Sequence, residues 1–499
     1  MIRRILFSLI LVVFALQLAN RVYLIIEPSP DIGGIETTFV HGVQSIQHHG
    51  TLYKNPEKPP YEFFQYHPLY FYTVALLVDK GDDPVSIYRV GRALNLVFNL
   101  LTIALLAFFM KHQLSIEKYL AWAIALGAFS LFWSHNIAVR PDSLKTFCIV
   151  TSASLFGKYI LANYYSKNNQ PLTDSIVSFF PIALCSTLAF ATKQDGILAM
   201  GIFPLTLWVA MGFSRAFLLG IMMLLSNLLF VLLLSSTSPL YWTNAWLGLN
   251  QGLSLPWLGY MASFHRLDLL LYGGWLGAWI IGWVRLRKND AHKKIWLTFT
   301  IPWWVLGLWM MLKWGSTPVY LMEAILFMLL STAWLIQGLP QLCNVLLASM
   351  LLFSVLWFGQ GNSMSHRFAQ VDRYDHLQED ALRKKKLADY LKNELHDNES
   401  VVSFDKALNV YLYPNLYWST YEAEYPNGMD CDFQFPFGPR KIFSLGPLHN
   451  ELMRGKLPYV IARPCNRIDA MLDLEQYDYH CTDTLYGYFL YTPHNKVTR

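Results

Sequence analysis

The feature that most constrains this chain is a series of apolar segments. A helix needs about 20 apolar residues to cross the bilayer core, because no water is present there to satisfy backbone polar groups. The first segment, Ile5 to about Ile26, is too long for a signal peptide and ends without a small-residue cleavage site, so we interpret it as an uncleaved helix. Together with ten further apolar segments it gives 11 predicted spans. The ten further segments are 88–110, 119–138, 143–161, 175–192, 196–212, 216–236, 267–284, 295–312, 318–336 and 341–358.

The composition supports a polytopic α-helical membrane protein. Of 499 residues, 54% are apolar and only 15% are charged, whereas soluble domains carry about a quarter charged residues. These proportions exclude a disordered chain, a collagen, a small disulfide scaffold and a single soluble domain. The net charge of +5 is too small to indicate a nucleic-acid partner.

The distribution of basic residues predicts the orientation. With a cytoplasmic N-terminus, most lysines and arginines between the spans fall in inner loops, as the positive-inside rule requires. These inner basic residues are Arg3, Arg4, Lys111, Lys118, Lys158, Lys167, Arg215, Arg285, Arg287, Lys288, Lys293 and Lys294. The same orientation places the first loop, 27–87, and the tail after Phe358 on the outer face.

The tail differs in composition from residues 1–358, which form the predicted membrane domain. Residues 359–499 open with a charged helical run from Asp372 to Glu394, and strands are expected at 400–404, 407–413, 457–462 and 486–491. We therefore predict a soluble extracytoplasmic α/β domain. Three cysteines lie in it, where a disulfide is chemically permitted: Cys431, Cys465 and Cys481.

Ionisable residues at the outer helix ends are the candidate functional residues, since charge near hydrocarbon is costly and usually functional. Asp31 and Glu36 follow the first span with two glycines between them. They belong either to a solvated loop or to a site with a general base. His67 opens an aromatic stretch, 67–80, that suits a helix in the membrane interface, and it is either an interfacial histidine or a phosphate contact.

Two further motifs lie at the outer ends of spans. In Arg140-Pro141-Asp142 the charged residues either pair with each other or line a cavity. Lys193, in Thr192-Lys193-Gln194-Asp195-Gly196, either reaches to water or binds a phosphate as a point charge.

The last motif combines Lys313, Tyr320 and Glu323. Lys313, like Lys193, either reaches to water or binds a phosphate as a point charge. Glu323 lies three residues after Tyr320 and therefore on the same helix face. A buried acid there needs a partner, and Lys313, Lys193 or a substrate could provide it. Taken together, the motifs predict an outer cavity for an anionic, lipid-borne substrate and a reaction that uses a base.

The order of these motifs resembles the GT-C superfamily of polyprenyl-phosphate-sugar-dependent glycosyltransferases. The chain is similar in particular to the bacterial aminoarabinose (lipid A) transferases and the protein O-mannosyltransferase-like family. The resemblance covers about residues 1–340 and rests on these motifs: the acids Asp31 and Glu36, Gly50-x-x-Tyr53, His67-Pro68-Leu69-Tyr70, Arg140-Pro141-Asp142, Thr192-Lys193-x-x-Gly196, Lys313-x-Gly315 and Tyr320-x-x-Glu323.

The resemblance implies a reaction and roles for residues. A sugar would pass with inversion from a polyprenyl (undecaprenyl-type) phosphate to an acceptor hydroxyl of a lipid, glycan or protein. The family usually carries adjacent Asp and Glu after the first helix, and the first-loop acid acts as the base. Here Asp31 and Glu36 are separated, so either could inherit that role.

Other positions follow from the same resemblance. Lys193 corresponds to a lysine that faces the lipid phosphate, Lys313 and Tyr320 to cavity-lining residues, and Asp142 to an acid of the second outer loop. His67 replaces a lysine of the aminoarabinose transferases, which leaves the sugar open.

The resemblance also implies a cellular location, and other functions compete with the one it implies. The implied setting is the bacterial inner membrane. No cofactor is expected, and the sequence does not indicate a divalent metal. The competing interpretations are a flippase or transporter of lipid-linked sugars and an O-antigen ligase or polymerase-like protein.

Overall fold

The structure is a computed structural model. It describes residues 1–26, 36–55, 58–60, 64–80, 83–132, 138–166, 172–249, 255–264, 266–285, 290–313, 316, 318–359, 371–396, 399–403, 405–418, 446–462 and 474–494. Asp31, Cys431 and Cys465 lie outside the described residues.

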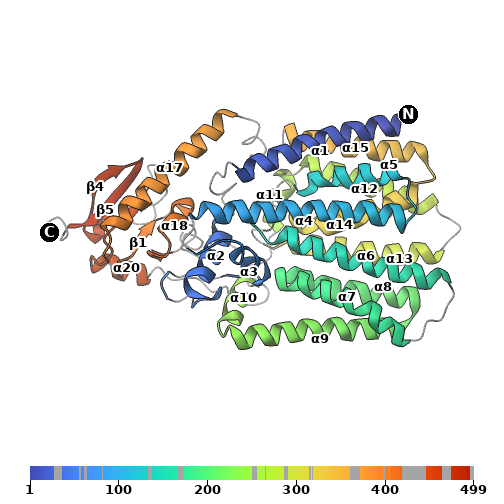
Figure 1. Ribbon diagram of the computed structural model, residues 1–499, viewed down its shortest axis with the longest axis horizontal. Helices are drawn as coiled ribbons and strands as arrows, with labels where there is room; N and C mark the ends of the chain where they lie inside the picture. The colour runs from blue at the N-terminus through green and yellow to red at the C-terminus, as the bar shows by residue number, and fades with distance from the viewer. Residues whose placement is uncertain are drawn as a thin grey trace.

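A bundle of roughly parallel helices forms the larger part of the molecule (Figure 1). Each of the 11 predicted spans overlaps a helix of the bundle. These helices are α1 (Ile2–Ile26), α4 (Val85–His112), α5 (Lys118–Ala128), α6 (Asp142–Ser166), α7 (Leu172–Thr192), α8 (Leu198–Met211), α9 (Phe213–Thr237), α12 (Arg266–Arg285), α13 (Asp290–Met311), α14 (Met322–Ile336) and α15 (Pro340–Gly359).

Short 3-10 turns extend three of these helices. The turn η1 (Phe129–Phe132) follows α5, η2 (Gln194–Ile197) precedes α8, and η3 (Pro318–Leu321) precedes α14. By length and composition, seven described helical segments could cross a membrane, and three further apolar helices are shorter. The chain is therefore a multi-pass membrane protein, as predicted.

Position in the bundle matches the character of each helix. α14 is apolar all round and is buried along nearly its whole length, as expected for a central helix. α9 instead leaves most of its leucines exposed, including Leu225, Leu229 and Leu232, as expected for a helix that faces lipid. α6 contacts α4, α7 and α8 and so lies inside the bundle.

Shorter helices lie between one end of the bundle and the tail domain. The first loop contributes α2 (Thr37–His49) and α3 (Leu69–Ala75), and α10 (Tyr241–Leu249) and α11 (Leu255–Phe264) connect α9 to α12. α2, α3 and α10 sit at the bundle end that faces the C-terminal domain (Figure 1). α3 falls within the stretch 67–80 that was predicted to lie in the interface.

The C-terminal domain contains a five-stranded sheet in the order β2-β1-β3-β5-β4. β1 is parallel to both β2 and β3, whereas β5 is antiparallel to β3 and β4. The strands are β1 (Val401–Ser403), β2 (Leu416–Trp418), β3 (Val460–Ala462), β4 (Tyr479–Leu485) and β5 (Tyr488–Pro493). The helices are α17 (Val371–Glu394), α18 (Lys406–Leu412) and α20 (Gly446–Met453).

One predicted strand of this domain is wrong. Residues 407–413 largely form α18, because Asp405 caps it: its side chain accepts hydrogen bonds from the backbone N–H groups of Ala407 and Leu408. α18 also joins the two domains, since Gln44 of α2 donates a hydrogen bond to the carbonyl oxygen of Val410 (2.8 Å).

Candidate active site

A cluster of buried charges lies where α6, η2 and α14 begin. Asp142, the first residue of α6, is fully buried. Its Oδ1 accepts a hydrogen bond from Lys193 Nζ (2.7 Å), and its Oδ2 lies 3.1 Å from Arg140 Nε. Lys193 precedes η2, and its ammonium group lies over the ring of Tyr320, 4.3 Å from the ring centroid. Two cations thus flank one carboxylate, and an aromatic ring lies against one of these cations.

A second set of ion pairs adjoins the first. Lys145 lies three residues after Asp142 and therefore on the same face of α6. Its Nζ is 2.8 Å from Asp195 Oδ2 and 3.0 Å from Glu323 Oε1. Thr146 also donates a hydrogen bond to Glu323 Oε1 (2.7 Å). The predicted partner of Glu323 was Lys313, Lys193 or a substrate; the structure places Lys145 there instead.

Lys313 follows α13 and is half-buried near this cluster. Burial and the neighbouring charge of Lys193 lower the pKa of Lys313 to about 8, with Asp195 acting in the opposite direction. The group is therefore mostly protonated at neutral pH but is close to its titration point.

Among the described residues of the cluster, basic side chains outnumber acidic ones. Its described members comprise four cations and three carboxylates, which leaves one positive charge when Lys313 is protonated. They are Arg140, Lys145, Lys193, Lys313, Asp142, Asp195 and Glu323. Buried ion pairs are costly and contribute little net stability, so a cluster that is rich in lysine and arginine suits the binding of an anionic ligand.

Glu36 lies at the same end of the bundle, in a separate ion pair. Arg92 of α4 donates from Nε to Oε1 (2.9 Å) and from Nη2 to Oε2 (2.5 Å), and both side chains are fully buried. The backbone N–H of Val139 donates to Oε1 as well (2.7 Å). Since Val139 directly precedes Arg140, this bond links Glu36 to the loop that carries the first cation of the cluster.

His67 is buried in an aromatic setting. Its Nδ1 contacts the carbonyl oxygen of Phe190 and therefore carries the proton, so its Nε2 accepts from the hydroxyl of Tyr241 (2.8 Å). Burial lowers the pKa of His67 to about 4, against the opposing effects of the Phe190 carbonyl and Asp195, so the ring is neutral at pH 7. Both nitrogens already have protein partners, which gives His67 a packing role in this structure.

Sequence reasoning missed Arg92, Lys145 and Asp195. Arg92 and Lys145 lie inside apolar segments that were assigned as spans, near their beginnings. A charge within a span is itself a signal of function, so both residues could have been found. Asp195 stands in the lysine motif but was not selected.

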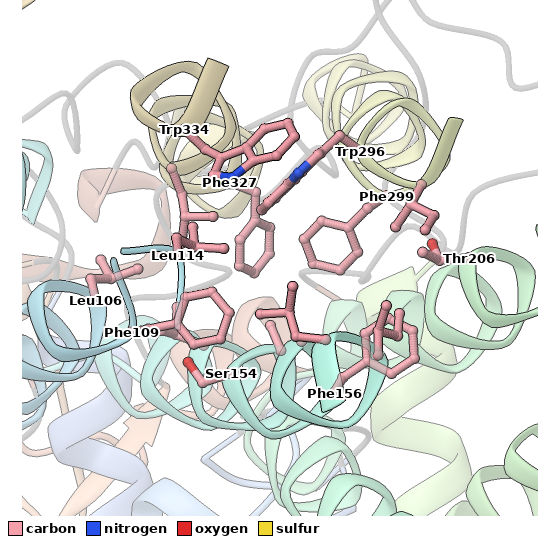
Figure 2. A pocket seen from close by; sticks show the side chains of 17 residues that line it. Leu106, Phe109, Leu114, Ser154, Phe156, Thr206, Trp296, Phe299, Phe327 and Trp334 are labelled. Carbon is pink, nitrogen blue, oxygen red and sulfur yellow. The ribbon is translucent and has the colours of Figure 1, made fainter. Parts of the chain in front are cut away.

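An apolar cavity of about 70 Å³ lies further along the same helices. Figure 2 shows aromatic side chains around it, among them Phe109, Phe156, Phe299 and Phe327. Ser154, which lines it, lies nine residues after Lys145, or about 14 Å along α6 at a rise of about 1.5 Å per residue. The cavity is therefore separate from the charged cluster.

Solved structures that match almost the whole chain include two of one protein. One is the crystal structure of ArnT from Cupriavidus metallidurans bound to undecaprenyl phosphate, with a TM-score of 0.58 and 12% identity over 98% of this chain and 97% of that chain. The other is the same protein in the apo state, with a TM-score of 0.57 and 12% identity over the same shares. The chain has the ArnT fold.

The ArnT fold confirms the fold that the resemblance implied. The coverage includes the C-terminal domain as well as the bundle. The Archaeoglobus fulgidus oligosaccharyltransferase, in complex with Zn and sulfate, matches less well, with a TM-score of 0.47 and 10% identity over 96% of this chain and 73% of that chain. No protein-family model and no curated protein sequence matches the chain.

Proposed function

We propose that this protein is an integral membrane glycosyltransferase that takes a sugar from a polyprenyl phosphate donor of the undecaprenyl type. The supporting observation is the buried charged cluster around Lys193 and Lys145, in a chain with the fold of a protein that was crystallised with undecaprenyl phosphate. The acceptor is a hydroxyl group of a lipid, glycan or protein on the outer face, and transfer inverts the anomeric carbon.

Lys193 is the proposed principal contact of the donor phosphate. Asp142 and the ring of Tyr320 hold its ammonium group in place, so little reorganisation is needed when charge develops on the leaving phosphate. Lys313 adds a second positive charge from the end of α13. Lys145 keeps the carboxylates of Asp195 and Glu323 compensated while the phosphate is bound.

The proposed base is a carboxylate of the first loop, either Glu36 or Asp31. Both oxygens of Glu36 already accept hydrogen bonds from Arg92 or Val139, so an acceptor hydroxyl would have to displace one of these donors. This arrangement supports an anchoring role for Glu36 and favours Asp31 as the base.

A double-mutant cycle separates the two roles of Glu36. If Glu36 only anchors Arg92, then Glu36→Gln, Arg92→Met and the double variant lose similar activity, because each removes the same pair. If Glu36 takes the proton, Glu36→Gln loses about 10²–10⁴-fold more than Arg92→Met. Asp31→Asn, measured beside them, loses that amount only if Asp31 is the base.

The proposed setting is a bacterial inner membrane with the N-terminus in the cytoplasm. Alkaline phosphatase fused after Arg499 should then be active in cells, because the C-terminal domain lies outside. A fusion placed after Arg215, in the first turn of α9 and between the predicted spans 196–212 and 216–236, should be inactive. The reverse result would overturn the orientation.

The direct test of the function uses purified protein and a panel of undecaprenyl-phosphate sugars. Transfer or hydrolytic turnover releases free undecaprenyl phosphate, which chromatography detects. Wild-type protein should release it with at least one donor, and Lys193→Ala should release it about 10²–10³-fold more slowly. A transporter would release none from any donor that it binds, which would contradict the proposal.

A further inference from the structure

Three side chains of types that can ligate a metal ion lie close together at one end of the β4–β5 hairpin in the C-terminal domain. Asp478, His480 and His494 are all exposed, and one ligand atom of each lies within 4.8 Å of the others. The imidazole rings of His480 and His494 are 5.1 Å apart, edge to face. None of the three contributes to the charged cluster, which lies in the membrane domain.

The sheet holds the backbone of these residues in place. Tyr479 pairs with Pro493 and His480 with Thr492 across the antiparallel ladder. The backbone N–H of His494 donates to the carbonyl oxygen of Asp478 (2.9 Å), which extends the ladder by one bond. The three side chains thus project from a backbone that the sheet already holds in place. Metal binding would require only rotation of these side chains.

The spacing suits a small divalent ion. Bonds of about 2.0–2.1 Å in a tetrahedral site place neighbouring ligand atoms about 3.4 Å apart. His480 Nε2 lies 3.4 Å from Asp478 Oδ1 already, and the 4.8 Å limit on the remaining separations leaves at most a small closure.

We propose that Asp478, His480 and His494 bind a zinc ion. Two imidazoles and one carboxylate favour zinc over calcium or magnesium, which prefer all-oxygen ligands. Water completes the fourth position. The ion ties the first residues of the edge strand β4 to the end of β5 and so stabilises this end of the sheet. From sequence alone the site was not apparent, because His494 is distant in the chain from the Asp478-Tyr479-His480 pair of ligands.

The test is zinc binding by the full-length, tag-free protein in detergent after EDTA treatment and desalting. We expect one zinc equivalent that is lost in His480→Ala and in His494→Ala, with affinity lower by at least about tenfold. His396→Ala, which removes another exposed histidine of the same domain, should bind as the wild type does. Calcium should not compete for the site.

Stability provides the second measurement. Zinc should raise the unfolding temperature of the wild type and of His396→Ala but not of His480→Ala, because a ligand that binds the folded state stabilises it. If the wild type binds no zinc, if the His480 and His494 variants retain the full equivalent, or if calcium displaces zinc, the proposal is wrong. Near-identical circular dichroism spectra establish that the variants are folded.

Discussion

The charged cluster and the apolar cavity are built on the same helices and differ in almost every other respect. At its beginning α6 carries Asp142 and Lys145, each in contact with side chains from other elements. Further along, α6 and α14 line the cavity with residues such as Phe156 and Phe327. Since packing alone would favour apolar residues throughout the bundle, the buried charges mark the end where we place the proposed reaction.

The largest expected effect comes from removing the lysine that two carboxylates share. Lys145→Met leaves Asp195 and Glu323 without their common cation and should lower the free energy of unfolding by about 3–5 kcal/mol. Thermal unfolding in detergent measures it. Lys158→Met, which replaces an exposed lysine of the same helix, is the matched control. Equal stability of the two variants would contradict this role of Lys145.

Removing Lys193 should affect catalysis more than stability. Asp142 keeps Arg140 as a second cation in Lys193→Ala, so the buried carboxylate stays compensated. The rate of undecaprenyl phosphate release should fall about 10²–10³-fold, as for loss of one preorganised charge-stabilising group. Lys158→Ala should keep the wild-type rate. A Lys193→Ala protein that retained more than a tenth of the activity would exclude the phosphate contact.

The pH dependence of donor binding tests Lys313. Its pKa of about 8 means that the ammonium group is charged below pH 8 and neutral above it. Affinity for undecaprenyl phosphate should therefore fall about tenfold as the pH rises from 7 to 9. A tenfold change is what the loss of one hydrogen bond between charged groups is expected to cause. Lys313→Arg keeps its charge over this range and should remove the decrease. A similar decrease in both proteins would assign the titration to another group.

The smallest effect is expected in the cavity. Ser154→Val places apolar atoms in the space shown in Figure 2 and should stabilise the protein by about 0.5–1 kcal/mol. The release rate should stay within about twofold of wild type, because the charged cluster begins elsewhere on α6. A large loss of activity would show that the cavity takes part in the reaction and would break the contrast between the two regions.

The helices of the bundle could be predicted because membrane insertion imposes one simple requirement, a long apolar segment. The C-terminal domain imposes no such pattern. β4 was not predicted, since most of its residues are exposed and do not alternate, and β2 has only three residues. In α18 the residues Val410, Tyr411 and Leu412 favour a strand locally, and the cap at Asp405 outweighs that preference.

Several residues of the candidate site could be predicted from the sequence, but the contacts between them could not. Arg140, Asp142 and Lys193 could be selected because each lies at the end of an apolar segment. The ion pair between Lys193 and Asp142 joins residues 51 positions apart, and helix packing rather than local sequence sets that distance. The same reason explains why Glu36 could be proposed beside Asp31 as the base, whereas its ion pair with Arg92 could not be predicted.

Binding of undecaprenyl phosphate to the purified protein tests the central claim most directly, because it needs neither the sugar nor the acceptor. Native mass spectrometry or a fluorescent competitor lipid would compare the wild type with Lys193→Ala and Lys158→Ala. The account predicts that the wild type and Lys158→Ala bind equally and that Lys193→Ala binds at least about tenfold more weakly. Equal binding by all three proteins would contradict the claim that the buried cluster holds the lipid phosphate.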